Sequence, residues 1–207
     1  MYVEFWFDPL CPFSWMTSRW LNRVAQERDL RISWRSLSLL FKNEAGEDHP
    51  IYEFFRRTTD LLRVVEAVRA AGHEDRIGEL YTEFGKRIHN RGEMDFDVAE
   101  LLASYGLAPA LADALNEESW DEVIRESMAE GLSLTGPDVG TPLMAIDGKA
   151  GRVGWFGPVL TELPEVGEAA EIWDSFVKLA GTPFFYELKR ARTAHPVPPS
   201  EAALARA

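Results

Sequence analysis

A single cysteine is the strongest nucleophile in this sequence. Cys11 is the only cysteine among 207 residues, and Pro12, Phe13 and Ser14 follow it. Proline is favoured in the first turn of a helix, so Cys11 is predicted to lie at a helix N-terminus. Unpaired backbone N–H groups and the helix dipole stabilise a thiolate there, and the Ser14 hydroxyl is placed to donate a hydrogen bond to it. We therefore predict a lowered thiol pKa and catalytic roles for Cys11 and Ser14.

The lack of a second cysteine restricts the chemistry that Cys11 can perform. A mixed disulfide on Cys11 cannot be released by an internal thiol, because position 14 holds serine. A free low-molecular-weight thiol must regenerate the enzyme, which predicts a monothiol cycle. The alternative interpretation is that Cys11 is a small buried apolar residue, as free cysteines often are.

The elements around Cys11 are predicted from the spacing of apolar residues. Residues 2–7 (YVEFWF) alternate like a strand, residues 8–10 form a loop, and apolar residues recur at helical spacing from Pro12. Residues 30–37 (LRISWRSL) alternate again. The chain therefore opens with a strand, a helix and a second strand, which form a parallel β-α-β unit.

The rest of the chain is predicted to be a helical segment followed by a hairpin and a helix. Residues 50–133 carry almost only helical patterns, with breaks near Gly72, Gly92 and Gly106. A strand at 143–146, a turn at Asp147-Gly148, a return strand at 152–156 and a helix at 166–179 follow. This order predicts an α/β thioredoxin fold, β-α-β … β-β-α, with an inserted all-helical subdomain. The predicted boundaries are 1–42 and 134–193 for the thioredoxin-like domain, 43–133 for the helical insertion and 194–207 for a flexible tail.

Composition excludes several classes of function. A net charge of −12 disfavours nucleic acid as a partner. The basic cluster Lys189, Arg190 and Arg192 is interpreted as the solvated end of a helix rather than a binding patch.

No run approaches the ~18 apolar residues of a membrane span, and no signal peptide is evident. With one cysteine as well, we expect a cytoplasmic protein without a membrane partner. Neither a metal-ligand spacing nor a nucleotide-binding glycine loop is present.

Two further segments are candidates for substrate binding. Thr141-Pro142 stands just before the strand at 143–146, where a cis bond would present the Thr141 backbone to an extended thiol substrate. By frequency alone a trans proline is expected.

An aromatic pocket in the helical segment is a second hypothesis, with Tyr52, Phe54 and Phe55 as its walls. Ordinary core packing is the preferred interpretation of these side chains.

Longer stretches of the sequence resemble a known family. The opening Phe5-Trp6-Phe7-Asp8-Pro9-Leu10-Cys11-Pro12, with Trp15 and Thr17-Ser18-Arg19-Trp20, resembles the mycothiol-dependent nitroreductases of actinobacteria, a DsbA-like branch of the thioredoxin superfamily. Further similar segments follow in order along nearly the whole chain: Ser36-Leu37-Ser38, Asn43-Glu44, Arg87-Ile88-His89-Asn90, Asp138 to Pro142, Phe156 to Leu160 and Phe184 to Arg190.

The resemblance implies an enzyme with a defined thiol site. It implies mycothiol or a similar thiol as co-substrate and no flavin, with Cys11 as the nucleophile and Thr141-Pro142 as a cis-proline bordering the thiol groove. Asn43 and His89 match family positions near this groove, and with Pro12 and Phe13 they complete the predicted thiol- and substrate-binding set. The substrates implied are disulfides or small electrophilic or nitro compounds.

The motif departs from the family pattern at the position that matters for the cycle. The usual motif is Cys-Pro-Trp-Cys, whereas Phe13 and Ser14 stand here. The sequence also resembles the kappa-class glutathione transferases, in which a serine near this turn activates a cofactor thiol. A thiol S-transferase or isomerase is therefore the alternative enzyme, and a non-catalytic thioredoxin-fold binding module is a third hypothesis. Whether two chains form a homodimer is left open.

Overall fold

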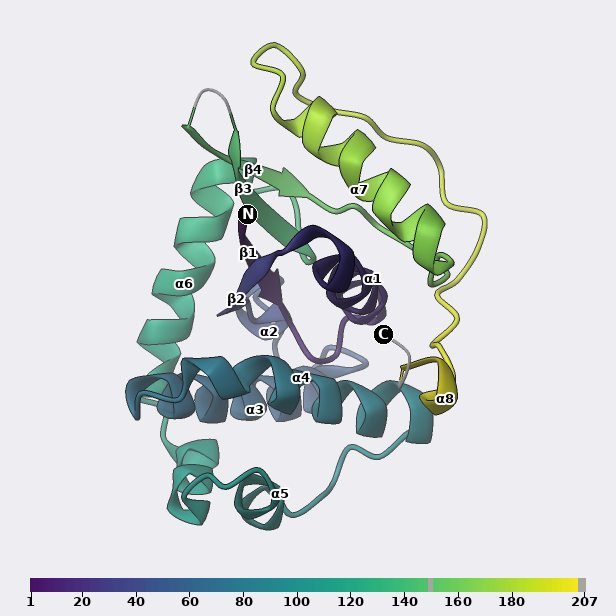
Figure 1. Ribbon diagram of the computed structural model, residues 1–207. Helices are drawn as coiled ribbons and strands as arrows, with labels where there is room; N and C mark the ends of the chain where they lie inside the picture. Colours follow the sequence, from purple (N-terminus) through teal and green to yellow (C-terminus); the bar gives the residue numbers. More distant parts are fainter. Residues whose placement is uncertain (149–150, 205–207) are drawn as a thin grey trace.

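The protein is built on a four-stranded mixed sheet (Figure 1). The computed structural model describes residues 1–148 and 151–204, so the tip of the β3–β4 hairpin and the last three residues of the predicted flexible tail lie outside the described range. The strand order is β2-β1-β3-β4; β1 pairs parallel to β2 and antiparallel to β3, which pairs antiparallel to β4. The strands are β1 (Tyr2–Phe7), β2 (Arg31–Ser36), β3 (Leu143–Gly148) and β4 (Gly151–Phe156).

Alternating side chains of β1 supply two separate apolar clusters. Phe5 and Phe7 point to one face and join the large core, in which Trp34 of β2 lies edge-on to both rings. Trp6 points to the other face, where it packs with Leu143. Because Phe5, Trp6 and Phe7 are almost fully buried, the central strand is covered on both faces, while Tyr2 at its start is exposed.

Three helices flank the sheet and fix the strand ends (Figure 1). On one face, α1 (Pro12–Arg28) packs against α7 (Val166–Ala180), and the Trp20 indole of α1 donates to the Ala169 carbonyl at 3.0 Å. On the other face lies α6 (Trp120–Thr135), whose Ser127 carbonyl accepts a hydrogen bond from the Trp6 indole at 2.7 Å. These two hydrogen bonds therefore join α1 to α7 and β1 to α6.

The segment between β2 and β3 is helical, as predicted. Gly72, Gly92 and Gly106, at the predicted breaks, all have positive φ, a conformation that glycine adopts without a steric penalty. The fold class, an α/β thioredoxin fold with a helical insertion, is confirmed. In chain order this segment comprises α2 (Leu39–Lys42), α3 (Tyr52–Ala70), the 3-10 turn η1 (Glu74–Arg76), α4 (Ile77–Gly85), the π-helical turn η2 (Lys86–Arg91), α5 (Val98–Ser104), the 3-10 segment η3 (Pro109–Asn116) and α6.

After α7 the chain returns across the molecule to a short last helix, α8 (Glu201–Leu204). Residues 183–200 are neither helix nor strand. The interpretation of Lys189, Arg190 and Arg192 as a helix end is therefore wrong, because α7 ends at Ala180 and Gly181 follows as its C-cap. Within the described residues, no helix has the length and apolar character needed to cross a membrane.

Candidate active site

Cys11 caps the N-terminus of α1. Its backbone is extended, and its sulfur accepts a hydrogen bond from the Ser14 backbone N–H at 3.5 Å. The thiol donates to the Thr141 carbonyl oxygen at 3.4 Å. Pro12 occupies the first helical turn, as predicted, where a missing N–H leaves no hydrogen bond unmade. The sulfur thus sits between a donor that favours the thiolate and an acceptor that favours the protonated thiol.

Ser14 and Thr141 meet although 127 positions separate them. Their side-chain oxygens share a hydrogen bond, and the Thr141 hydroxyl is also 3.4 Å from the Trp6 carbonyl of β1. The Ser14 side chain is fully buried, and the bond between Thr141 and Pro142 is cis, as the family resemblance implies. The loop before β3 is therefore bound directly to the turn that carries the nucleophile.

The surroundings of Cys11 oppose ionisation of its thiol. Burial raises the pKa of the Cys11 thiol, and the negative charge of Asp8 acts in the same direction; the N–H and hydroxyl of Ser14 lower it by less. The predicted lowering of this pKa is wrong for the buried thiol. The prediction counted the helix N-terminus alone and not the loss of water around a side chain that is only 7% exposed.

Asp8, in the loop between β1 and Cys11, is a buried carboxyl group. One of its oxygens accepts from the Leu10 N–H at 2.8 Å and the other from the Leu39 N–H at 2.7 Å, so it joins the Cys11 loop to the start of α2. Burial raises the pKa of Asp8 to about 6, against the lowering effect of these N–H groups and of the Thr58 hydroxyl. This carboxyl group therefore titrates near neutral pH beside the nucleophile.

The side chains of Trp15, His89 and Arg19 form a stack next to the turn that carries Cys11. The Trp15 ring is nearly parallel to the imidazole of His89, with 5.9 Å between the ring centroids, and the guanidinium carbon of Arg19 lies 4.3 Å from the Trp15 ring centroid. The His89 Nε2–H donates to the Pro9 carbonyl at 2.8 Å, just before Cys11. Burial lowers the pKa of His89 to about 4, so the ring is neutral at physiological pH and holds the loop through a neutral hydrogen bond.

The sequence matches the Rv2466c-like family, described as the mycothiol-dependent nitroreductase Rv2466c, over residues 10–190. The chain belongs to this family. It is 31% identical over 196 residues to the uncharacterized protein Rv2286c of Mycobacterium tuberculosis, covering 92% of this chain and 82% of that protein. The match begins immediately before the nucleophile and includes both cis-proline loops, Thr141-Pro142 and Gly157-Pro158.

Solved structures support the fold at low sequence identity. The cytosolic disulfide reductase DsbM from Pseudomonas aeruginosa is similar, with a TM-score of 0.58 and 14% identity, over 87% of this chain and all of that one. A 2-hydroxychromene-2-carboxylate isomerase is similar at a TM-score of 0.58 and 18% identity, over 86% of this chain and 96% of that chain. A protein named as a disulfide reductase and a protein named as an isomerase thus share this architecture.

The structure brings some of the predicted binding residues together and not others. Phe13 is half-buried two positions from the nucleophile. His89 bonds to the Pro9 carbonyl, and Thr141, which precedes Pro142, bonds to Cys11 and Ser14. Asn43 is exposed as the C-cap of α2, where its backbone N–H bonds to the Leu39 carbonyl. Its role, like that of the whole predicted set, stays a prediction.

The proposed aromatic pocket is divided in the structure. A shallow cleft of about 310 Å³ lies between α2, the start of α3 and α6, and Tyr52 lines it together with Phe41 and Arg125. Phe55 is instead buried in the protein, and Phe54 is 47% exposed. Of the three candidates, Tyr52 alone lines this cleft. Elsewhere in the described residues, no group of three or more side chains is arranged to hold a metal ion.

Asp8 and the stack behind Cys11 were missed as functional residues by sequence reasoning. Asp8 stands in an Asp-Pro loop, where a solvated turn is the ordinary expectation. From the sequence, Arg19 is one charged residue on a predicted amphipathic helix. In the structure its side chain is 3% exposed, and burial lowers its pKa to about 10. The available signal was the family-like stretch between Phe5 and Trp20, interrupted at Phe13 and Ser14, which carries these residues with Cys11.

Proposed function

We propose that this protein is a cytoplasmic thiol-dependent reductase in which Cys11 acts alone, with mycothiol or a similar low-molecular-weight thiol as electron donor. One observation carries the proposal: the Cys11 sulfur caps α1 beside the Thr141 carbonyl of the cis-proline loop, with serine in place of a second thiol. The family supplies the class of co-substrate. A single cysteine in the chain suits a reducing compartment.

The cycle follows from thiol–disulfide exchange. The Cys11 thiolate attacks one sulfur of a disulfide R–S–S–R′, forms a mixed disulfide with RS and releases R′S⁻, which takes up a proton. The thiolate of a free RSH then attacks the sulfur of the bound RS group, so that R–S–S–R leaves and the Cys11 thiolate returns. The net reaction is RSSR′ + RSH → RSSR + R′SH, so one RSH is consumed for each R′SH released. An acceptor that is not a disulfide would instead take two electrons from two RSH, which leave as RSSR. For a nitro compound, the first two-electron step would give the nitroso compound and water.

Ser14 bears on the choice between reductase and transferase. An S-transferase of the kappa-class type needs a hydroxyl that reaches a bound cofactor thiol. The Ser14 hydroxyl is fully buried and shares its hydrogen bond with Thr141. This arrangement favours the reductase, in which Ser14 shapes the Cys11 turn, over a transferase in which Ser14 contacts the cofactor.

The deciding experiment uses a mixed disulfide between mycothiol and a chromophoric thiol, with mycothiol as reductant. Wild-type protein is expected to release the chromophore over many turnovers and to carry a mycothiol adduct on Cys11 by mass spectrometry. Cys11→Ser is expected to abolish both signals while folding normally by circular dichroism. A matched control is Ser104→Ala, whose hydroxyl bonds, among the residues that the structure describes, only to the Leu101 carbonyl within α5.

Other outcomes separate the alternatives. Turnover that survives in Cys11→Ser but not in Ser14→Ala would support a transferase or isomerase and contradict the monothiol cycle. Binding of mycothiol by calorimetry with no turnover in wild-type protein would support the non-catalytic binding module instead.

A further inference from the structure

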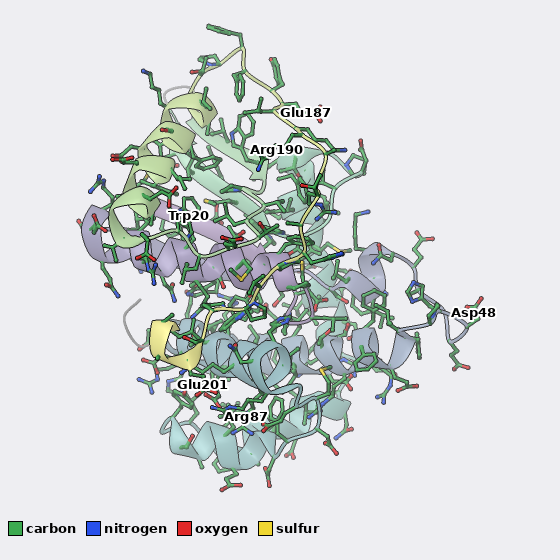
Figure 2. The ribbon with its side chains drawn as sticks, turned by 90° about the vertical axis from the view of Figure 1, so that its right-hand side faces the viewer. Trp20, Asp48, Arg87, Glu187, Arg190 and Glu201 are labelled. Atoms are coloured by element: carbon green, nitrogen blue, oxygen red, sulfur yellow. The ribbon has the colours of Figure 1, made fainter. Side chains whose placement is uncertain are left out.

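The segment between α7 and α8 crosses the molecule beside the active site. In Figure 2 it runs from Glu187 past Arg190 down to Glu201, across the face turned to the viewer. Near its start, the Phe185 ring stacks on Trp155 of β4, with 5.5 Å between the ring centroids. The first part of the segment is thereby fixed on the edge strand of the sheet.

The far end of the segment is also bound to the protein. The Val197 N–H donates to the Thr161 carbonyl at 2.8 Å, and the Asn90 side-chain amide donates to the Pro199 carbonyl at 2.6 Å. Arg91 forms an ion pair with Glu201 at 2.8 Å. Since Asn90 and Arg91 belong to the π-helical turn that also carries His89, the segment ends on the element that holds the Cys11 loop.

Between these two anchors, Arg192 reaches the active-site motif. Its guanidinium carbon lies 4.3 Å from the centre of the Phe13 ring. A guanidinium stacked by its face on an aromatic ring keeps the N–H groups on its edge free, and that edge matches a carboxylate with two parallel hydrogen bonds. Arg192 is exposed, and within the described residues no acidic side chain forms an ion pair with it, with Arg190 or with Lys189.

We propose that Arg192 determines substrate specificity by recognising a carboxylate or similar oxyanion on the disulfide or electrophile that Cys11 attacks. The proposal rests on the proposed function and deepens it by naming a substrate class. An unpaired cation held against Phe13, two positions from the nucleophile, in a chain with net charge −12 gives an anionic substrate a favourable point of entry. The segment 183–200 serves in this view as a wall of the substrate site, with Arg192 as its contact residue.

The test measures single-turnover reaction of Cys11 with two aromatic disulfides, so it needs no thiol cycle. One reagent, 5,5′-dithiobis(2-nitrobenzoate), carries a carboxylate on each ring, and the other, 2,2′-dithiodipyridine, is neutral. Arg192→Ala is expected to slow the anionic reagent about two- to fivefold at low ionic strength, the factor that an exposed ion pair gives. It should leave the neutral reagent unchanged, and salt should reduce the wild-type preference. The matched control, Arg190→Ala, removes the same charge from the same segment and should keep that preference.

Three results would overturn the inference. Equal slowing by Arg192→Ala and Arg190→Ala would mean a general charge effect. An equal change with both reagents would mean that Arg192 only covers the thiol. A Cys11 that reacts with neither reagent in wild-type protein would remove the proposed function itself, and this inference with it.

Discussion

The buried carboxyl group of Asp8 makes stability depend on pH in a way that can be calculated. Its pKa is about 6 in the folded protein, against an ordinary value of 3.8. The folded state therefore holds the proton more tightly, so the contribution of Asp8 to stability is present below pH 3.8 and is lost as pH rises through 6. The full difference corresponds to about 3 kcal/mol, and about 2 kcal/mol of it falls between pH 4.5 and 7.5.

Asp8→Asn isolates this effect. The side-chain amide of the variant has one oxygen, which can accept from the N–H of Leu10 or of Leu39, so the other N–H loses its acceptor. This loss lowers the free energy of unfolding by about 1–3 kcal/mol at any pH. That cost cancels when urea-unfolding free energies of wild type and variant are compared at the two pH values. Wild type should lose about 2 kcal/mol relative to Asp8→Asn as pH rises from 4.5 to 7.5. Asp97→Asn is the control, because Asp97 is an exposed helix cap.

A difference that stays constant with pH would refute the reasoning, since it would mean that Asp8 is ionised across the whole range. The same variant has a second readout at the thiol. The Asp8 charge raises the pKa of Cys11, so Asp8→Asn should move the midpoint of Cys11 alkylation to lower pH. A structural defect alone would change the alkylation rate without moving that midpoint.

Two further predictions address the turn around Cys11. Ser14→Cys should let the protein release a bound thiol from a mixed disulfide without external mycothiol, checked by mass spectrometry after gel filtration; persistence of the adduct would argue against serine as the cause of the monothiol cycle. Gly85→Ala should destabilise the protein by about 1–3 kcal/mol in urea unfolding, because its Cβ would lie 2.2 Å from the Trp15 ring. Gly167→Ala meets no atom within 4 Å and should be close to neutral.

Regular local patterns account for what the sequence predicted well. β1 was predicted to the residue because its aromatic side chains alternate toward two buried faces, and the start of α1 because proline suits only the first helical turn. The helix breaks were predicted at glycines, and in the structure these glycines adopt a positive φ. Each of these features depends on a few neighbouring residues, which is the information that a single sequence holds.

Features that depend on contacts between distant segments could not be predicted from the sequence. The pKa of Cys11 was predicted in the wrong direction, because its burial depends on packing that the helix pattern does not contain. The bond between Ser14 and Thr141 joins residues far apart in sequence. The path of Arg192 was missed because basic residues after an amphipathic helix ordinarily cap that helix, whereas here the chain turns away at Gly181 and crosses to Phe13.

The burial of Cys11 fits an enzyme that has no second cysteine. A dithiol can protect itself from over-oxidation by closing its own disulfide, whereas a lone sulfenic acid must wait for an external thiol. A thiol that is 7% exposed and hydrogen-bonded to the Thr141 carbonyl, with a pKa raised by burial, is protonated and poorly accessible in the resting protein. Reactivity should then depend on the substrate's own binding contacts. A thiol of this kind needs a nearby residue that selects the substrate without making the free thiol more reactive. Arg192, which contacts Phe13 of the motif, is such a residue in the proposed specificity.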